Sequence, residues 1–404
     1  MNYISKYESL KCFADHQTCR MILAFLLGVV ISSCQTHKTS TETEISVLST
    51  IPGGVPALRP IDWRMEIASD LFKKVGEGEW VSPKVNTPFP FDELIYSWNI
   101  QLQDKEAFRL YLKVEFEPGD ETSWLYAGFW GEVKDPVVNR EKPKFDRGWL
   151  DMDWLKLNTK AVSYQYKVVD SGTKTLSLPP SFMVITTDNH PTPGLAERFS
   201  PVYQGESVSV QVFDIPLRLQ MDSHGNPMKS RCQSAALASA LEYYGKSVNL
   251  EDIVSYTHDP EYDYPGLWPR VIGAANEFGF DGYVDRIRDW NAVRNTLAQK
   301  KIVLCSIRMA EGDCKAPPYP QMGNHIVVLN GITEDGRVVV TDSFSGLWKD
   351  HKGYLCQWLL EDFEKVWMKT KGGVSMVICP PAGFREKAVE NLPDFPTDRN
   401  LSLP

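Results

Sequence analysis

Alternating apolar and polar positions predict short strands in the first half of the chain. In FRLYLKVEFEP, residues 108–118, apolar residues alternate with mostly polar ones, which is the pattern of a half-buried strand. The neighbouring stretches LIYSWNIQL and SWLYAGFWGEV are equally short and rich in aromatic and β-branched residues. Turn signals such as Pro118-Gly119-Asp120 separate these stretches. Residues 61–205 are therefore predicted to form an all-β sandwich of the jelly-roll kind.

The pattern changes after about residue 206, where helical periodicity comes first and strands follow. The predicted helices lie at residues 233–245, 250–258, 267–279 and 290–300. The predicted strands lie at residues 301–309, 325–332, 337–344 and 375–380. Asn249 and Asp289 stand where helix N-caps are expected. Helices followed by antiparallel-type strands predict an α+β domain over residues 206–382, with a loose tail at 383–404.

An apolar run near the N-terminus has the form of an export signal. MILAFLLGVVISSCQ, residues 21–35, is too short an apolar run for a membrane span and suits the core of a signal peptide. Ile31-Ser32-Ser33-Cys34 resembles the lipobox of bacterial lipoproteins, which implies cleavage before Cys34 and lipid on its sulfur. An uncleaved anchor is the alternative. Residues 1–34 are thus a predicted signal segment and residues 35–60 a flexible tether, which places the remaining chain in the bacterial envelope, outside the cytoplasm.

Composition and charge narrow the classes of function. The 404 residues, 43% hydrophobic and 24% charged, suit a globular protein of two domains. A net charge of −9 without a basic run argues against a nucleic-acid partner. No pair of cysteines has zinc-finger spacing, so we expect no metal and no cofactor. Five cysteines follow Cys34, so at least one thiol stays unpaired even in an oxidising compartment.

One of these cysteines stands at the head of a predicted helix. Cys232, in KSRCQSAALASALEYYG, precedes a run of strong helix formers, and Gly245 occupies the expected C-terminal cap. Unpaired N–H groups and the positive pole of the helix dipole at that end favour a thiolate over a thiol. Free cysteine is also among the most buried residue types, so by position alone a structural role is the alternative.

Three further residues supply what a thiol hydrolase needs beside its nucleophile. His325 begins a strand in GNHIVVLNGITEDGRVVVTDSFSG, residues 323–346, which turns and returns to Asp342. A hairpin of this kind brings the carboxylate of Asp342 to the ring of His325, whose other nitrogen is then free to face the thiol. Gln220 precedes Cys232 and offers an amide that can donate to an oxyanion together with the backbone N–H of the cysteine.

The order of these parts resembles a known family. A Gln, a Cys heading an Ala-rich helix that ends in YYG, a Gly-x-His followed by hydrophobic residues, and an Asp after the strand return are similar to papain-like cysteine peptidases of the bacteriocin-processing, double-glycine leader type. The resemblance covers residues 214–380. It implies a papain-like domain with Cys232 as nucleophile, His325 as base, Asp342 as orienting residue and Gln220 as oxyanion donor.

The residues after the cysteine depart from that family. Its members commonly carry Gly-Pro there, whereas this chain has Gln233 and Ser234, which are expected to border the bound substrate. Asn324, within Gly-x-His, and Trp268, near the end of HDPEYDYPGLWP at residues 258–269, complete the predicted substrate-binding set. The latter segment is a candidate wall or lid of the groove, and an ordinary surface loop is the alternative.

Together these features predict a lipid-anchored envelope cysteine peptidase or amidohydrolase that cleaves peptide or amide bonds. Its partners would be a peptide or protein substrate and the membrane that holds its lipid. Tryptophans in the predicted sandwich suit either a core or a sugar-stacking platform, which leaves contact with glycan or peptidoglycan open. Two alternatives remain: an inactive peptidase-like fold that binds peptide or glycan, and a transglutaminase or acyltransferase that uses the same three residues.

Overall fold

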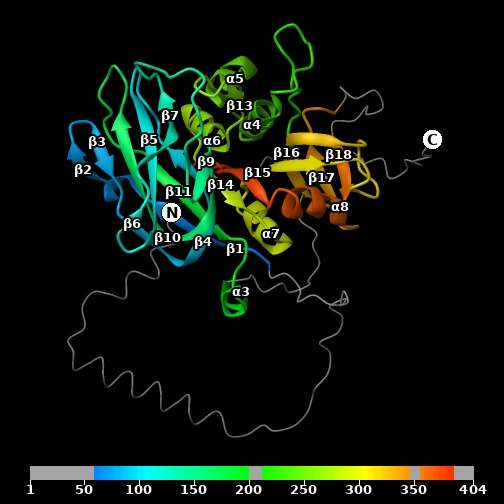
Figure 1. Cartoon of the computed structure of the whole chain (residues 1–404). Coiled ribbons are helices and arrows are strands. Elements are labelled where there is room, and N and C mark those ends of the chain that lie inside the picture. Colours follow the sequence, from blue (N-terminus) through cyan, green and yellow to red (C-terminus); the bar gives the residue numbers. More distant parts are fainter. Residues whose placement is uncertain (1–58, 200–211, 346–354, 386–404) are drawn as a thin grey trace, which may run out of the picture. The chain divides into compact units, whose positions relative to one another are not determined.

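The computed structural model describes residues 59–199, 212–345 and 355–385 (Figure 1). We refer to residues 59–199 as the β region and to residues 212–385 as the α+β region. The predicted signal segment with Cys34, and nearly all of the predicted tether, lie outside the described residues. Within the described residues, no helix combines the length and apolar character needed to cross a membrane.

Antiparallel strands joined in one sheet form the β region. The strands are β1 (Ile61–Ile67), β2 (Lys73–Gly76), β3 (Glu79–Val81), β4 (Val85–Asn99), β5 (Ala107–Glu117), β6 (Asp120–Glu121), β7 (Leu125–Gly131), β8 (Lys144–Phe145), β9 (Gly148–Asp151), β10 (Trp154–Asp170) and β11 (Ser181–Asp188). A 3-10 turn η1 (Ser69–Leu71) and helix α3 (Pro193–Phe199) complete the region. Their all-β character agrees with the sequence pattern.

The arrangement of these strands differs from two separate sandwich layers. The hydrogen-bonded order is β1-β11-β4-β10-β3-β2, and β5 and β9 branch from β10. The first half of β10 pairs with β4 and β9, and its second half pairs with β5 and β3. Because the long strand β10 pairs with both sets of partners, the two sheets expected of a sandwich are joined into one continuous sheet here.

Aromatic side chains fill the centre of the β region. Trp98 and Trp130 are almost fully buried, with ring centroids 6.1 Å apart, so these two tryptophans are core residues. Trp124, Trp149 and Trp154 are half-buried, and a lysine ammonium lies over each of their rings. Of the tryptophans for which a core and a sugar-stacking platform were both considered, Trp98 and Trp130 are therefore core residues.

The α+β region contains one antiparallel sheet with helices packed on it. Its helices are α4 (Cys232–Tyr243), α5 (Leu250–Thr257), α6 (Trp268–Glu277), α7 (Trp290–Ala298), α8 (Leu360–Glu364) and a π-helical turn η2 (Lys365–Lys369). Its strands are β12 (His258–Asp259), β13 (Tyr264–Pro265), β14 (Gly282–Arg286), β15 (Ile302–Met309), β16 (Met322–Ile332), β17 (Arg337–Thr341), β18 (Leu355–Leu359) and β19 (Val374–Ile378). Six of these form the sheet, in the order β14-β19-β15-β16-β17-β18.

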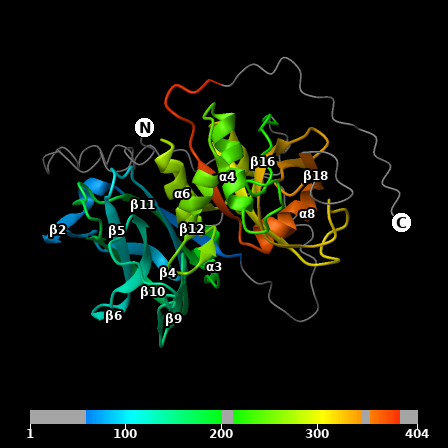
Figure 2. The same cartoon turned by 90° about the horizontal axis from the view of Figure 1, so that it is seen from above.

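Helix α4 is buried on nearly all sides, which explains its run of alanines. It packs against β16 and α6, as Figure 2 shows, and also against β15 and α5. Small side chains allow the backbone of α4 to approach these neighbours closely. Gly245 follows α4 with φ +88°, and its N–H donates to the carbonyl of Glu242 at 2.9 Å, so the predicted glycine cap is confirmed.

The predicted N-caps of the next helices are also confirmed. The side chain of Asn249 accepts from the N–H of Glu251 at the start of α5, and that of Asp289 accepts from the N–H of Ala292 in α7. The predicted hairpin is formed by β16 and β17 and turns at Gly336, which has φ +78°. These local signals thus set the frame that carries the candidate site.

Buried polar contacts join the β region to the α+β region. Asn276 of α6 accepts from the N–H of Ile100 at 2.9 Å, and its amide donates to Asn99 at 3.0 Å. The N–H of Val284 in β14 donates to the hydroxyl of Ser97 in β4 at 3.0 Å. Three arginine–carboxylate pairs also lie along this contact: Arg64 with Asp285, Arg286 with Glu93, and Arg288 with Asp62. The two regions are therefore held together by specific hydrogen bonds as well as by apolar packing.

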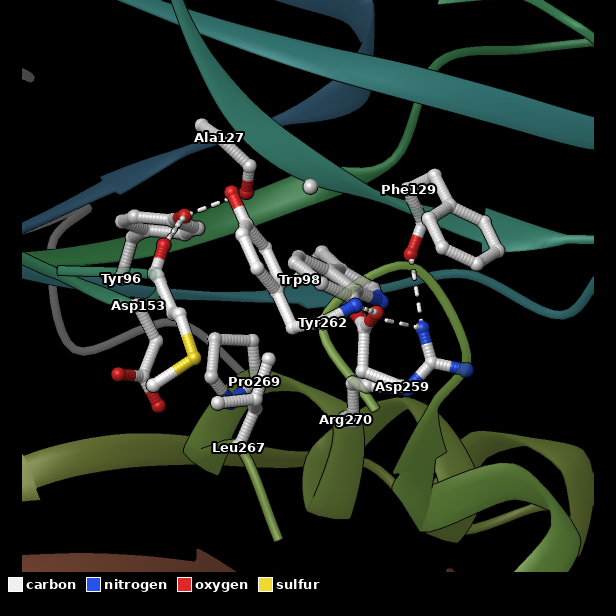
Figure 3. A pocket seen from close by; sticks show the side chains of 12 residues that line it. Tyr96, Trp98, Ala127, Phe129, Asp153, Asp259, Tyr262, Leu267, Pro269 and Arg270 are labelled. Atoms are coloured by element: carbon white, nitrogen blue, oxygen red, sulfur yellow. Dashed lines mark hydrogen bonds and ion pairs between the residues drawn. The ribbon is translucent and has the colours of Figure 1, made fainter. Parts of the chain in front are cut away.

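A small cavity of about 10 Å³, room for a single water, lies within this contact (Figure 3). Tyr96 and Phe129 line it from the β region, and Tyr262 and Pro269 line it from the α+β region. Asp153 stands at its edge, and its carboxylate accepts from the N–H of Trp268 at 2.7 Å. Burial, opposed only in part by this hydrogen bond, raises the pKa of Asp153 to about 7.

The raised pKa makes the effect of Asp153→Asn depend on pH. An acid whose pKa is higher in the folded state destabilises the fold as pH rises, here from about 4 to about 7. Asparagine keeps an oxygen for Trp268 and does not ionise. We therefore expect the free energy of unfolding of the variant, relative to the parent, to rise by about 2–4 kcal/mol between pH 4.5 and pH 8. Urea denaturation at both pH values measures this difference. Asp146→Asn, at an exposed position, is the control, and an equal difference at both pH values would contradict the assignment.

Candidate active site

Cys232 is the first residue of α4 and is only 7% exposed. The preceding residue, Arg231, provides no side-chain cap to the helix. Its guanidinium instead donates to the carbonyl of Met221 at 3.0 Å and pairs with Glu251 at 2.5 Å. The thiol therefore stands at an uncapped helix N-terminus, where the electrostatic field favours negative charge.

His325, near the start of β16, forms a buried pair with Asp342, just after β17. The Nε2 atom of the ring lies 2.7 Å from Oδ1 of the carboxylate, and the two residues are 4% and 0% exposed. The carboxylate also accepts from the N–H of Phe344 at 2.8 Å and from the hydroxyl of Tyr319 at 3.0 Å. Because both oxygens of Asp342 are bound, its orientation toward the imidazole is fixed.

The charges of this pair reinforce each other. Burial alone would lower the pKa of His325, but the adjacent Asp342 carboxylate and a hydrogen bond with Cys232 outweigh it and raise this pKa to about 10. Burial opposes ionisation of Asp342 as well, yet His325 and the hydrogen bonds from Phe344 and Tyr319 lower the pKa of that carboxyl. The imidazole is thus held as an imidazolium through neutral pH, in hydrogen-bond contact with the sulfur.

Gln220 is buried beside the strand end that carries Asp342. Its backbone N–H donates to the carbonyl of Ser343 at 3.2 Å, and its side-chain oxygen accepts from the Ser343 hydroxyl at 2.9 Å. Its Nε2 atom donates one hydrogen to the carbonyl of Met228 at 2.7 Å. A side-chain amide carries two hydrogens on that nitrogen, so this anchoring leaves one of them for another acceptor.

Gln233, the residue after Cys232, lies directly against the thiol. Its Nε2 atom donates to the carbonyl of Ser230 at 2.8 Å, so its oxygen faces Cys232 and accepts from the thiol at 3.4 Å. Gly266 leaves the space for this side chain, because a Cβ there would come within 2.7 Å of Gln233. The amide of Gln233 is therefore held in one orientation next to the sulfur.

The other predicted substrate-binding residues lie in different surroundings. The hydroxyl of Ser234 shares a 2.7 Å hydrogen bond with that of Thr257 and is buried between α4 and α5. Trp268 begins α6, and its ring packs against Trp154 of the β region with centroids 5.8 Å apart. Asn324 is exposed and accepts from the ammonium of Lys371 at 3.3 Å. The structure thus groups Cys232, Gln233 and His325, whereas Ser234 faces the helix packing.

Tyr319 is a site residue that the sequence did not indicate. The hydroxyl of Tyr319 donates to Oδ2 of Asp342. The residue lies in a proline-rich loop ahead of β16, where the sequence has no periodic pattern. A hydroxyl-bearing aromatic a few residues before the histidine was the available signal, and it is a weak one.

The segment at residues 258–269 is also more buried than the surface loop that we considered as an alternative. Asp259 and Glu261 are almost fully buried against the β region, while Tyr264 is exposed. The pKa of Tyr264 is raised by burial and by the nearby charges of Asp153 and Cys232, among others. This segment therefore connects the β region with the neighbourhood of the thiol.

The described residues hold five free cysteines and no group of three or more His, Cys, Asp or Glu side chains arranged to bind a metal ion. Cys305 lies in β15, where burial raises its pKa well above the usual value. Cys314 is half-buried, and burial together with Asp362 raises its pKa to about 11. Among the described cysteines, Cys232 has the imidazolium beside it.

Comparison with known proteins identifies both regions. Residues 212–375 match the Peptidase_C39 like family, and residues 68–180 match the family described as Peptidase C39 N-terminal domain. Residues 212–375 thus form a Peptidase C39-like domain, and the protein is cysteine peptidase-like. No curated protein matches the chain.

Two solved structures resemble part of the chain. One is a double glycine motif protease from an AMS/PCAT transporter in complex with the leader peptide, with 20% identity, a TM-score of 0.28, and coverage of 42% of this chain and 94% of that one. The other is the peptidase domain of Streptococcus ComA, a bi-functional ABC transporter involved in a quorum sensing pathway, with 16% identity, a TM-score of 0.27, and coverage of 41% and 97%.

Proposed function

We propose that the protein is a papain-like cysteine peptidase or amidohydrolase, anchored to the bacterial envelope by lipid on Cys34, that cleaves peptide bonds with Cys232, His325 and Asp342. The observation that carries the proposal is the buried 2.7 Å pair of His325 and Asp342, with the imidazole in hydrogen-bond contact with the cysteine at the head of α4. A nucleophile, a base and a group that orients the base are the minimum for this chemistry.

The reaction is acyl transfer through a thioester. The sulfur of Cys232 attacks the carbonyl carbon, and the oxyanion accepts from the backbone N–H of Cys232 and from the remaining amide hydrogen of Gln220. His325 gives its proton to the leaving amine as the C–N bond breaks. The neutral imidazole then takes a proton from water, which attacks the thioester, and the acid leaves as the thiolate returns. Asp342 holds the ring in the tautomer that this exchange requires.

A second candidate function, peptide binding without hydrolysis, is favoured by one contact. The thiol of Cys232 donates to the oxygen of Gln233 at 3.4 Å, and an acceptor in that position favours the protonated sulfur. The field of the imidazolium favours the thiolate instead. A thiolate set by the His325 imidazolium indicates an enzyme, whereas a protonated thiol held by the Gln233 oxygen indicates a binding protein.

The pH dependence of alkylation at Cys232 distinguishes these two candidates. Because the Asp342 carboxylate raises the pKa of His325, we expect iodoacetamide to label Cys232 rapidly well below pH 7 in the full chain, and His325→Ala to slow this labelling by at least about tenfold. Site-resolved mass spectrometry measures both rates. Cys314 serves as an internal control that reacts only in alkaline solution. Labelling of Cys232 that rises only above pH 8, and is unchanged in His325→Ala, would favour the binding protein.

A further inference from the structure

Positive charge gathers beside His325 from both regions of the structure. Lys371, in the turn before β19, donates to the side chain of Asn324, the residue directly before His325, at 3.3 Å. Arg308 lies in the irregular part of the β15–β16 ladder, between the pairs Ile307–His325 and Met309–Met322. We refer to Lys371 and Arg308, together with Lys156 of the β region, as the basic cluster.

The members of the basic cluster are close enough to influence one another. Burial and the positive charges of Arg308 and Lys156 lower the pKa of Lys371, with a further contribution from Arg286. Among the described residues, no carboxylate lies within ion-pair distance of Lys371 or Arg308. Asp153 lies nearby, and burial raises its pKa to about 7. Lys156, by contrast, pairs with Asp151 at 3.5 Å, so the positive charge without a carboxylate partner among the described residues is that of Lys371 and Arg308.

An aromatic side chain supports the cluster from the β region. The ammonium of Lys156 lies 3.8 Å from the ring of Trp154, and the guanidinium of Arg286 lies 5.3 Å from the same ring. Arg286 is only 4% exposed, and its Nε atom has no hydrogen-bond partner among the described residues. Trp154 in turn packs on Trp268 of α6. Both regions thus build one surface that presents cations and holds an unsatisfied buried donor.

We propose that the basic cluster binds a carboxylate of the peptide held at Cys232, and so selects substrates that carry a negative charge close to the cleaved bond. This inference rests on the proposed function. A carboxylate accepts from more than one cationic donor at once, so it can pair with Lys371 and Arg308 together. Lys371 contacts Asn324, the residue directly before His325, so the cluster lies at the end of β16 that carries the catalytic imidazole.

Alkylating peptides test this site without requiring hydrolysis. Bromoacetyl-Gly-Gln-amide is the neutral probe, bromoacetyl-Gly-Glu-amide adds a side-chain carboxylate, and bromoacetyl-Gly-Gln with a free C-terminus adds a terminal one. Rates of labelling at Cys232 are measured by mass spectrometry in the full chain, in detergent. We expect at least one acidic probe to label about tenfold faster than the neutral probe, and the advantage to shrink as salt is added. Whichever acidic probe is faster identifies the source of the carboxylate.

Variants that remove positive charge test whether the faster labelling by acidic probes depends on the basic cluster. In the double variant Lys371→Gln and Arg308→Gln, the acidic and neutral probes are expected to label at equal rates. The double variant Lys73→Gln and Lys74→Gln, an equal charge change at exposed positions of β2, should keep the full ratio. Equal rates for all probes in the parent protein, or a ratio that survives in the double variant, would overturn the inference. The neutral probe tested with His325→Ala reports separately on the proposed function, so the two failures are distinguishable.

Discussion

Replacing Cys232 with alanine is expected to lower peptide hydrolysis by a factor of at least about 10⁴, because the variant has no atom that can form the thioester. The remaining imidazolium and oxyanion donors bind a substrate but break no bond through an acyl intermediate. The measurement is the release of new amino termini from a mixed peptide library, followed by mass spectrometry, with the full chain and with the variant. Cys232 is the predicted source of the whole activity, which makes this the largest effect that we expect of a single side chain.

The matched control for this variant is Cys314→Ser. Cys314 is also a free, partly accessible thiol, but it contacts the carbonyl of Asp362 in α8, and none of the described histidines lies beside it. Its replacement is expected to leave hydrolysis within about twofold of the parent, as for most surface changes. Equal activity in the parent and in Cys232→Ala would assign hydrolysis to another group and remove the basis of the proposed mechanism.

Much of the frame around Cys232 follows from local sequence signals. The caps at Asn249, Asp289 and Gly245 act within a few residues of their helix ends, so short-range pattern is sufficient to find them. The hairpin that brings Asp342 to His325 is equally local, since the alternation of two strands and one glycine turn fixes it.

The contacts that the sequence did not predict join segments far apart in the chain. Tyr319 reaches Asp342 from an irregular loop, and no periodicity marks such a residue. Gln233 was expected to border the substrate, yet the direction of its amide depends on Ser230 and on the absence of a side chain at Gly266. Lys156 and Lys371 come together only because the β region packs on the α+β region. Side-chain orientation of this kind is decided by tertiary packing rather than by local propensity.

The β region was expected to be an accessory sandwich, and its buried contacts give it a more direct structural part. Glu261, in the segment before α6, is 0% exposed and accepts from Arg140 at 2.6 and 3.2 Å, from the hydroxyl of Tyr126, and from the N–H of Val137 at 3.0 Å. Burial opposes its ionisation, but these bonds outweigh burial and lower its pKa. A single carboxylate of the α+β region thus satisfies three groups of the β region.

Replacing Glu261 with alanine is therefore expected to lower the free energy of unfolding by about 3–5 kcal/mol, the cost of leaving a buried charge and its hydrogen-bond donors without a partner. Urea denaturation followed by tryptophan fluorescence measures the loss. The control is Glu121→Ala, which removes a 2.6 Å pair with Lys113 on the exposed side of the β region and should cost at most about 1 kcal/mol.

A double-mutant cycle with Arg140→Ala shows whether the loss arises from the contact between the regions. Once Glu261 is gone, Arg140 has lost its carboxylate partner, so the second replacement should cost far less than it does in the parent protein. Because Gly266 of the same segment lies against the side chain of Gln233 beside the thiol, loosening the segment is also expected to slow the labelling of Cys232. Additive losses in the cycle would mean that Glu261 and Arg140 stabilise the fold independently, and that the β region does not position the segment beside the thiol.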